Sequence, residues 1–218
     1  TSGLPLELAK ISNNLGFVLF QLGRPIEAEG AYRKAIDAHR ANGALTSLIG
    51  PYNGMGNVLR EQGRTDEAAG YYGRALVLAQ ESEDRVNVGI AYTYLGRCAE
   101  QQGRLADAKH DLGMALNILE QTRFWNGLAR VYESIADLHI AGGDWPNAMK
   151  CADKRIELAR QHRNQRMELA AWKQKLTACE GAGLIKQAGL CAAELDRLSL
   201  TDAGPARADA ASLVLGGK

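Results

Sequence analysis

Three asparagines and three arginines form a spaced series in the first part of the chain. Asn13 and Asn53 are 40 residues apart, and Asn57 and Arg97 are separated by the same interval. An amide carries both a donor and an acceptor, so it can pair with the backbone of a bound peptide whatever its side chains. A guanidinium can bind a carboxylate through two parallel hydrogen bonds. We therefore expect a peptide ligand with acidic positions, contacted by Asn13, Asn53, Asn57, Arg60, Arg97 and Arg130.

The residue types that support catalysis or metal binding are not arranged for either. None of the four cysteines forms a Cys-x-x-Cys pair, and no histidine follows a cysteine at zinc-finger spacing. We expect the thiols to be reduced and packed as small apolar groups, as in a cytoplasmic protein. The sequence predicts no cofactor, no metal site and no enzymatic activity. These cysteines are Cys98, Cys151, Cys179 and Cys191.

Composition excludes two further classes of partner. The net charge is +1 over 218 residues, without long runs of one sign, so neither nucleic acid nor an anionic membrane is favoured. No stretch approaches the roughly 18 uninterrupted apolar residues of a membrane helix. The chain starts without Met, a basic segment or an apolar segment, so we expect no signal peptide and a fragment or processed chain.

The elements that must position the polar series follow a 40-residue repeat. One glycine column is Gly23, Gly63, Gly103, Gly143 and Gly183, and an alanine stands five residues after each. Glycine tolerates the left-handed backbone that ends a helix, so each repeat should contain two helices joined at this column. A second small-residue column, Gly16, Gly56, Gly96 and Ala136, should let the two helices approach closely. The aromatic column Tyr52, Tyr92, Tyr132 and Trp172 should fill the space between repeats.

The repeat predicts ten helices. First helices are expected near 4–21, 45–61, 85–101, 125–141 and 165–181, and second helices near 25–42, 65–82, 105–121, 145–161 and 185–199. Gly50-Pro51 falls inside one of them, and proline there should kink the helix or delay its start. The fifth repeat is atypical, because Lys175 and Leu176 stand where Leu-Gly is expected. Terminal repeats often deviate because one face meets solvent.

The columns resemble the tetratricopeptide repeat. Tyr92-x2-Leu95-Gly96, followed by Gly103 and Ala108, shows the pattern most fully. The long unit is similar to kinesin light chains, Pins-type adaptors and the sensor arrays of MalT- and AfsR-type regulators. The resemblance implies an all-α fold, a right-handed superhelix of about five hairpins over residues 1–199. The repeats should span 4–43, 44–83, 84–123, 124–163 and 164–199, and residues 200–218 should form a capping helix or a truncated sixth repeat.

The same resemblance implies that the first helices line a concave groove. By phase, the residues that should face it are Asn13, Phe17, Asn53, Asn57, Arg60, Tyr94, Arg97 and Arg130. The alternatives are solvated polar residues for the Asn and Arg set and core packing for Phe17. Co-chaperones that clamp heat-shock protein termini carry Lys at the phase of Asn13 and Asn at the phase of Phe17, so the chain departs from that subclass.

The sequence thus predicts a protein-interaction scaffold that binds another protein or a peptide in this groove. One alternative is a sensor segment of a larger signalling ATPase or transcription regulator. Another is a self-assembly module that forms homo-oligomers. All three rest on the repeat architecture, because a fold alone does not specify a function.

Overall fold

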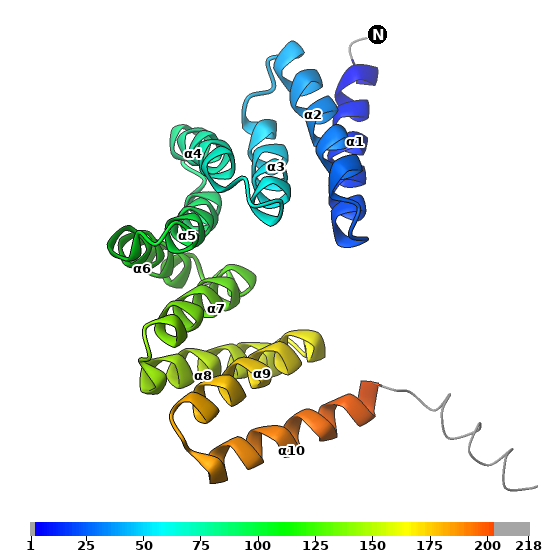
Figure 1. Ribbon diagram of the computed structural model, residues 1–218. Helices are drawn as coiled ribbons and strands as arrows, with labels where there is room; N and C mark the ends of the chain where they lie inside the picture. Colours follow the sequence, from blue (N-terminus) through cyan, green and yellow to red (C-terminus); the bar gives the residue numbers. More distant parts are fainter. Residues whose placement is uncertain (1–2, 203–218) are drawn as a thin grey trace, which may run out of the picture. The chain divides into compact units, whose positions relative to one another are not determined.

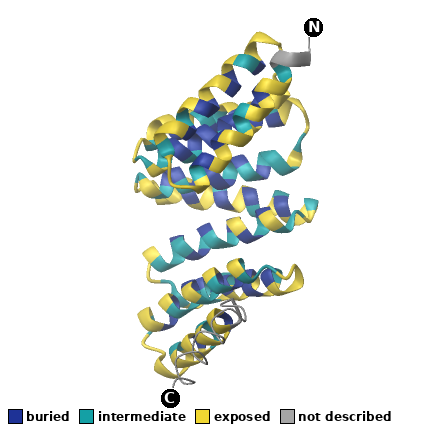
Figure 2. Ribbon diagram, turned by 90° about the vertical axis from the view of Figure 1, so that its right-hand side faces the viewer, coloured by how far each residue is buried: buried dark blue, intermediate teal, exposed yellow. Residues whose placement is uncertain are grey.

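The computed structural model describes residues 3–202, and this part of the chain is a series of α-helices without strands (Figure 1). The helices lie in hairpins along the sequence, and their buried residues alternate with exposed ones (Figure 2). Their bounds are α1 Gly3–Gln21, α2 Pro25–Ala41, α3 Ile49–Glu61, α4 Thr65–Glu81, α5 Arg85–Gln101, α6 Leu105–Thr122, α7 Trp125–Ala141, α8 Trp145–Gln161, α9 Gln165–Gly181 and α10 Ile185–Asp202.

The chain divides into two compact units, Thr1–Ser134 and Ile135–Lys218. In the first unit, α1 packs on α2, α3 on α4, and α5 on α6, while α2 also contacts α3 and α4 contacts α5. In the second unit, α9 packs on both α8 and α10. The expected all-α array of helical hairpins is confirmed. Residues 203–218, most of the segment expected to form a capping helix or a truncated sixth repeat, lie outside the described residues.

The first glycine column ends the first helices, as its spacing predicts. Gly23, Gly63, Gly103, Gly143 and Gly183 have φ values of 70°, 77°, 72°, 71° and 69°. These values lie in the left-handed region, where glycine pays no steric penalty. Of the ten expected helix ranges, eight agree with the structure to within one residue at each end. The exceptions are α10, which continues to Asp202, and α3.

Helix α3 starts four residues later than its equivalents would. A short 3-10 helix, Thr46–Leu48, precedes it, and Pro51 is the third residue of the α-helix. The first N–H groups of a helix have no partner within the helix, so proline is tolerated there and a kink is unnecessary. Of the two outcomes expected at Gly50-Pro51, the structure shows the delayed start.

The second small-residue column brings the helices of a hairpin together. A Cβ atom at Gly16 would lie 2.9 Å from the ring of Tyr32, and one at Gly56 would lie 2.5 Å from the ring of Tyr72. Such distances are too short for real contacts, so only glycine fits opposite these rings. In the fourth repeat alanine replaces this glycine, at position 136. The equivalent of Tyr32 there is Ala152, so Ala136 has no aromatic ring opposite it.

The aromatic column joins successive repeats, as expected. Arg40 at the end of α2 donates to the hydroxyl of Tyr52 on α3 at 2.9 Å. Trp172 on α9 lies under the guanidinium of Arg160 on α8, 5.7 Å from ring centroid to Cζ. Three of the four aromatic rings therefore have a described contact with the last turn of the preceding second helix. The observed pairs are Arg40–Tyr52, Glu120–Tyr132 and Arg160–Trp172.

Candidate functional site

A stacked tyrosine pair lies at the centre of the expected groove residues. The rings of Tyr72 on α4 and Tyr94 on α5 have centroids 4.7 Å apart and planes 16° apart. The Tyr72 hydroxyl donates to Oδ1 of Asn57 at 2.8 Å, and Nδ2 of Asn57 lies 3.5 Å from the Tyr94 hydroxyl. Both rings are buried. Asn57 therefore uses its amide to hold this pair in place.

Two arginines, Arg60 and Arg130, act on the tyrosine pair, and Arg97 follows Tyr94 by three residues on α5. The guanidinium of Arg130 lies over the ring of Tyr94, with Cζ 4.7 Å from the centroid, and its side chain is exposed. Arg97 forms a long ion pair with Glu133, 3.9 Å between nitrogen and oxygen. Burial raises the pKa of Tyr72, and the proximity of Tyr94 adds to this, while Arg60 opposes it. The phenol therefore stays neutral, and the arginines carry the local charge.

Two buried polar atoms at this site have no hydrogen-bond partner within the described residues. They are Oδ1 of Asn53 and Nε of Arg60, both on α3. Buried polar atoms in native structures are nearly always paired, so each such atom calls for an explanation. A bound peptide group or an ordered water molecule could supply one acceptor and one donor here. The two α3 residues, Asn57, the two tyrosines and the other two arginines form what we term the tyrosine cluster. Its members are Asn53, Asn57, Arg60, Tyr72, Tyr94, Arg97 and Arg130.

Asn13 lies apart from the tyrosine cluster, in a polar cavity of about 300 Å³ between α1, α2 and the start of α3. The cavity is also lined by Lys10 and by His39, which is buried and whose Nδ1 has no partner within the described residues. Burial lowers the pKa of His39, and the charge of Lys10 lowers it further. The imidazole is therefore neutral at physiological pH.

Phe17 on α1 is 57% exposed. It occupies the phase of Asn57, so the polar series of α3 is replaced by an apolar ring in the first repeat. This exposure argues against core packing of Phe17, whereas Phe20, on the same helix, packs against the core.

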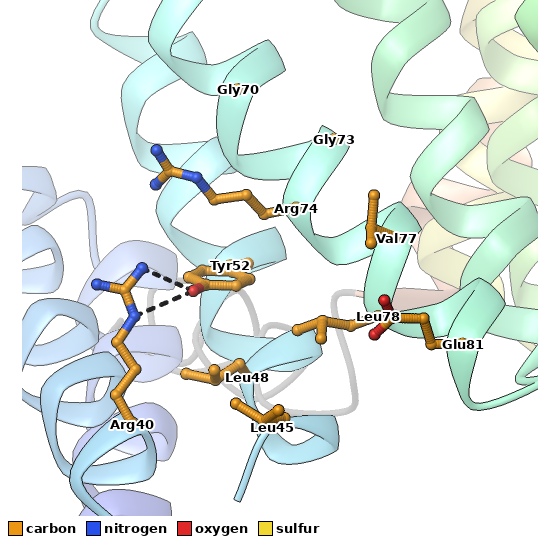
Figure 3. Close-up of a pocket in the computed structure, with 10 residues that line it drawn as sticks. All are labelled: Arg40, Leu45, Leu48, Tyr52, Gly70, Gly73, Arg74, Val77, Leu78 and Glu81. Carbon is orange, nitrogen blue, oxygen red and sulfur yellow. Dashed lines mark hydrogen bonds between the residues drawn. The ribbon is translucent and has the colours of Figure 1, made fainter. Parts of the chain in front are cut away.

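An apolar cleft of about 630 Å³ lies between α2 and α4, and sequence reasoning did not predict it. Figure 3 shows its lining, in which Tyr52 lies beside Arg40 and Arg74, and Glu81 lies away from them beyond Val77 and Leu78. We term it the α2–α4 cleft. It shares no residue with the tyrosine cluster, and its lining is Arg40, Leu45, Leu48, Tyr52, Gly70, Gly73, Arg74, Val77, Leu78 and Glu81.

Two family models match the chain, and both describe the tetratricopeptide repeat. One covers residues 47–121 and the other residues 8–42. The chain belongs to the tetratricopeptide repeat family. Its TPR units therefore include the α1–α2, α3–α4 and α5–α6 hairpins, and TPR proteins are generally non-catalytic. The TPR fold accordingly indicates a protein-interaction scaffold.

Solved structures with the same TPR fold include nearly identical TPR-like repeats from Podosopora anserina, described as those of a kinesin light chain. They are 14% identical, with a TM-score of 0.67 over 91% of this chain and 97% of that one. BtubC from P. vanneervenii is 16% identical, with a TM-score of 0.70 over 94% and 93%. A signal transduction ATPase with a TPR sensor from Pyrococcus horikoshii is 14% identical, with a TM-score of 0.72 over 92% of this chain and 31% of that one. No curated protein matches the chain.

The cysteines of the TPR array are free, and burial raises the pKa of Cys98, Cys151 and Cys191 to about 11. Thiols with such pKa values are protonated at neutral pH and are poor nucleophiles. Among residues 3–202 there is no group of three or more His, Cys, Asp or Glu side chains that could hold a metal ion. None of the helices described is long and apolar enough to cross a membrane.

Sequence reasoning placed Tyr94 and Asn57 in the groove but missed Tyr72. The missing signal was its phase, since Tyr32, Tyr72 and Leu112 recur at 40-residue intervals and face the small-residue column. Tyr72 is fully buried, so it positions Asn57 and Tyr94 and offers no surface of its own.

Proposed function

We propose that this TPR array binds an acidic peptide segment of a partner protein at the tyrosine cluster and has no catalytic role. The observation that carries the proposal is the combination of cations and unpaired atoms at one place. Arg60 and Arg130 act on one buried tyrosine pair, Arg97 follows Tyr94 by three residues, and the buried Asn53 Oδ1 lacks a partner within the described residues. Carboxylates suit the arginines, and a backbone N–H suits the amide oxygen.

The tyrosine pair supports the proposal by making the site rigid. The stacked rings and the Asn57 hydrogen bonds fix the groups around them before any ligand arrives. A preorganised site loses less conformational entropy on binding, so more of the contact energy appears as affinity. The ring of Tyr94 also holds Arg130 above it, where an exposed guanidinium can reach a ligand.

Isothermal titration with peptides rich in Asp and Glu tests the proposal, with matched Asn and Gln peptides as ligand controls. We expect Arg60→Ala and Arg130→Ala to weaken binding of the acidic peptides by about tenfold each, equivalent to about 1.4 kcal/mol. Arg33→Ala is the matched protein control, because Arg33 is exposed on α2 and pairs only with Glu29. Equal affinity for acidic and amide peptides would refute the proposed recognition.

Glu133 offers a sharper test with the opposite sign. Its carboxylate competes with a ligand for Arg97, to which it lies 3.9 Å away. Glu133→Gln should therefore strengthen binding of acidic peptides by a few fold and increase its dependence on ionic strength. A loss of affinity would show that Glu133 itself contacts the ligand.

A second candidate function, self-assembly, is favoured by the outer face of α1. Five apolar residues recur there at spacings of three and four, and each is at least half exposed: Leu8, Ile11, Leu15, Val18 and Leu22. Such a heptad stripe typically pairs with another helix. Light scattering should then detect a dimer that Leu15→Glu dissociates. A monomer at high concentration would exclude this function.

The alternative role, a sensor segment of a larger signalling ATPase or transcription regulator, needs a separate test. The similarity to a TPR sensor in a much longer ATPase supports it only as a proposal, since at this identity it shows the fold alone. The complete reading frame that encodes the chain would decide it. An adjacent nucleotide-binding domain would support the sensor role, and a frame limited to the repeats would contradict it.

A further inference from the structure

We propose that the α2–α4 cleft is a second peptide-binding site. It would take a short segment in which an acidic residue and a basic residue stand on opposite sides of an apolar residue. This inference goes beyond the proposed function, because the cleft shares no residue with the tyrosine cluster and is lined by α2, α4 and the segment from Leu45 to Tyr52. Four properties of the cleft carry it: its apolar lining, its bare helix surface, its separated charges and the absence of a side-chain bridge that the next repeat has.

The lining is apolar and open to solvent. Leu48 and Tyr52 are buried at the cleft, whereas Leu45 is 54% exposed and Val77 is 51% exposed. The volume of about 630 Å³ is within the usual range for ligand sites. Large aliphatic side chains that remain half exposed at one concave place indicate an interaction surface. The openness at Leu45 and Val77 suits a peptide side chain that enters from one face.

Helix α4 presents two glycines to the cleft. A Cβ atom at Gly70 or at Gly73 would meet nothing within 4 Å, so neither glycine is needed for packing inside the chain. Glycine within a helix costs about 1 kcal/mol relative to alanine. Because Gly70 and Gly73 have no side chains, the backbone of α4 is accessible at these positions. A ligand backbone can therefore approach it closely. The glycines therefore enlarge a cleft that already has an apolar lining.

The charges at the cleft are separated along its length. Arg40 and Arg74 lie beside Tyr52, and Glu81 lies away from them past Val77 and Leu78 (Figure 3). Arg40 donates to the Tyr52 hydroxyl, and Arg74 lies over the ring of Tyr71 at 5.0 Å. Within the described residues, neither arginine has a carboxylate partner. A ligand carboxylate near the arginines and a ligand cation near Glu81 would complement this arrangement.

The same corner of the next repeat carries a side-chain bridge. Arg85 is the repeat equivalent of Leu45, and Gln121 is the equivalent of Glu81. Arg85 donates to Oε1 of Gln121 at 2.5 Å, which bridges the start of α5 and the end of α6. Leucine at position 45 cannot make such a bridge. The cleft is therefore open at a corner where Leu45 and Glu81 depart from the residues of the next repeat, near the late start of α3.

Selection from a phage-displayed library of random dodecapeptides on the folded protein tests the proposal. We expect enriched peptides that carry an acidic and a basic residue on opposite sides of an apolar residue, and we expect their affinity, measured by fluorescence anisotropy, to fall at least about tenfold with Gly73→Leu. Leucine at position 73 should fill the cleft without disturbing the fold, because its Cβ meets nothing. Arg74→Glu should exclude the same peptides through charge reversal.

Gly113→Leu is the matched control, since Gly113 is the repeat equivalent of Gly73 on α6 and its Cβ also meets nothing. It should leave the affinity unchanged. Arg97→Ala should also leave it unchanged, which separates this site from the tyrosine cluster. Peptides that bind Gly73→Leu as well as the parent protein, or a selection that yields no peptide sensitive to Gly73→Leu, would overturn the proposal.

Discussion

The first repeat and the second follow one pattern, but the same positions have different surroundings. In the second repeat the equivalents of positions 8, 15 and 18 are Leu48, in the 3-10 helix before α3, and Met55 and Val58 on α3, and all are buried. On α1 they are Leu8, Leu15 and Val18, and all are at least half exposed. The difference arises because α3 packs on the preceding second helix, α2, whereas α1 has no such helix before it in the described chain. An apolar column thus forms core in one repeat and surface in another.

Two further positions distinguish the first repeat. His39 is the polar member of a column that continues with Ala79, Leu119 and Ala159, all fully buried. Gly43 is the first member of a column that continues with Glu83, Arg123 and Arg163. All four residues have positive φ, but only Gly43 lacks a side chain. The repeat pattern therefore specifies backbone and burial, while the residue at each phase decides how a repeat responds to charge, pH and strain.

The largest expected effect on stability is at Val58, the equivalent of Val18 in the second repeat. Val58→Asp places a charge at a site with no exposed surface, and it should lower the free energy of unfolding by at least about 3 kcal/mol. Val18→Asp should cost less than about 0.5 kcal/mol, because Val18 is 50% exposed. Urea denaturation measures both. Equal losses would mean that the outer face of α1 is covered in solution, as self-assembly requires.

The next effect concerns the small-residue column. Gly56→Ala should destabilise the protein by about 2 kcal/mol, because the added methyl group overlaps the ring of Tyr72. Gly16→Ala should cost about 1 kcal/mol, since its contact with Tyr32 is less severe, 2.9 Å against 2.5 Å. Gly113→Ala is the control and should stabilise the helix slightly. A stabilising Gly56→Ala would contradict the close hairpin packing.

A smaller effect is expected when His39 is protonated. Its pKa is lowered in the folded state, so the fold gains stability from neutral His39 above the unfolded pKa of about 6.5 and loses it as pH falls through the folded pKa. The melting temperature of the parent should therefore fall more than that of His39→Leu between about pH 7 and about pH 5. Leu119 shows that leucine fits this column. Parallel pH profiles would rule out the assignment.

The smallest effect concerns the turn that follows each second helix. Gly43→Ala should cost about 1 kcal/mol, because φ is 65° and the added Cβ meets nothing, so the penalty is conformational alone. Arg123→Gly relieves the same strain at φ 54° and should gain about 0.5 kcal/mol. Thermal denaturation of the two variants in parallel checks the pair. A loss of stability in Arg123→Gly would show that the side chain of Arg123 contributes more than its backbone costs.

The sequence predicted the structural features that depend on one residue type at one position of the repeat. Gly23 and its equivalents fixed the helix ends, and Gly56 indicated close approach, because each needs a property that only glycine has. The positive φ of Arg123 and Glu83 was not predicted, since neither residue type signals it. Pro51 indicated an irregular helix, but its position in the first turn became clear only in the structure.

The candidate sites were less predictable than the fold. Phase placed Asn57, Arg60 and Arg130 on first helices, but Tyr72 comes from a second helix, and its bond to Asn57 depends on how two hairpins pack. The α2–α4 cleft depends on side chains that are missing, at Gly70 and Gly73, and on a polar bridge that Leu45 cannot form. A void created by several helices leaves no motif in any one of them.

The nearest-neighbour packing of the hairpins has a consequence for the order in which the chain opens. The hydrogen bonds Asn57–Tyr94 and Gln174–Asp137 each span 37 residues, less than one repeat. Folding then requires only short loops to close, which is fast, and stability is a sum of local terms. Because the outer face of α1 is exposed among the described residues, whereas the equivalent face of α3 packs on α2, the amides of α1 should exchange with deuterium before those of α3. The first repeat should then fray while the Tyr72–Tyr94 stack is intact.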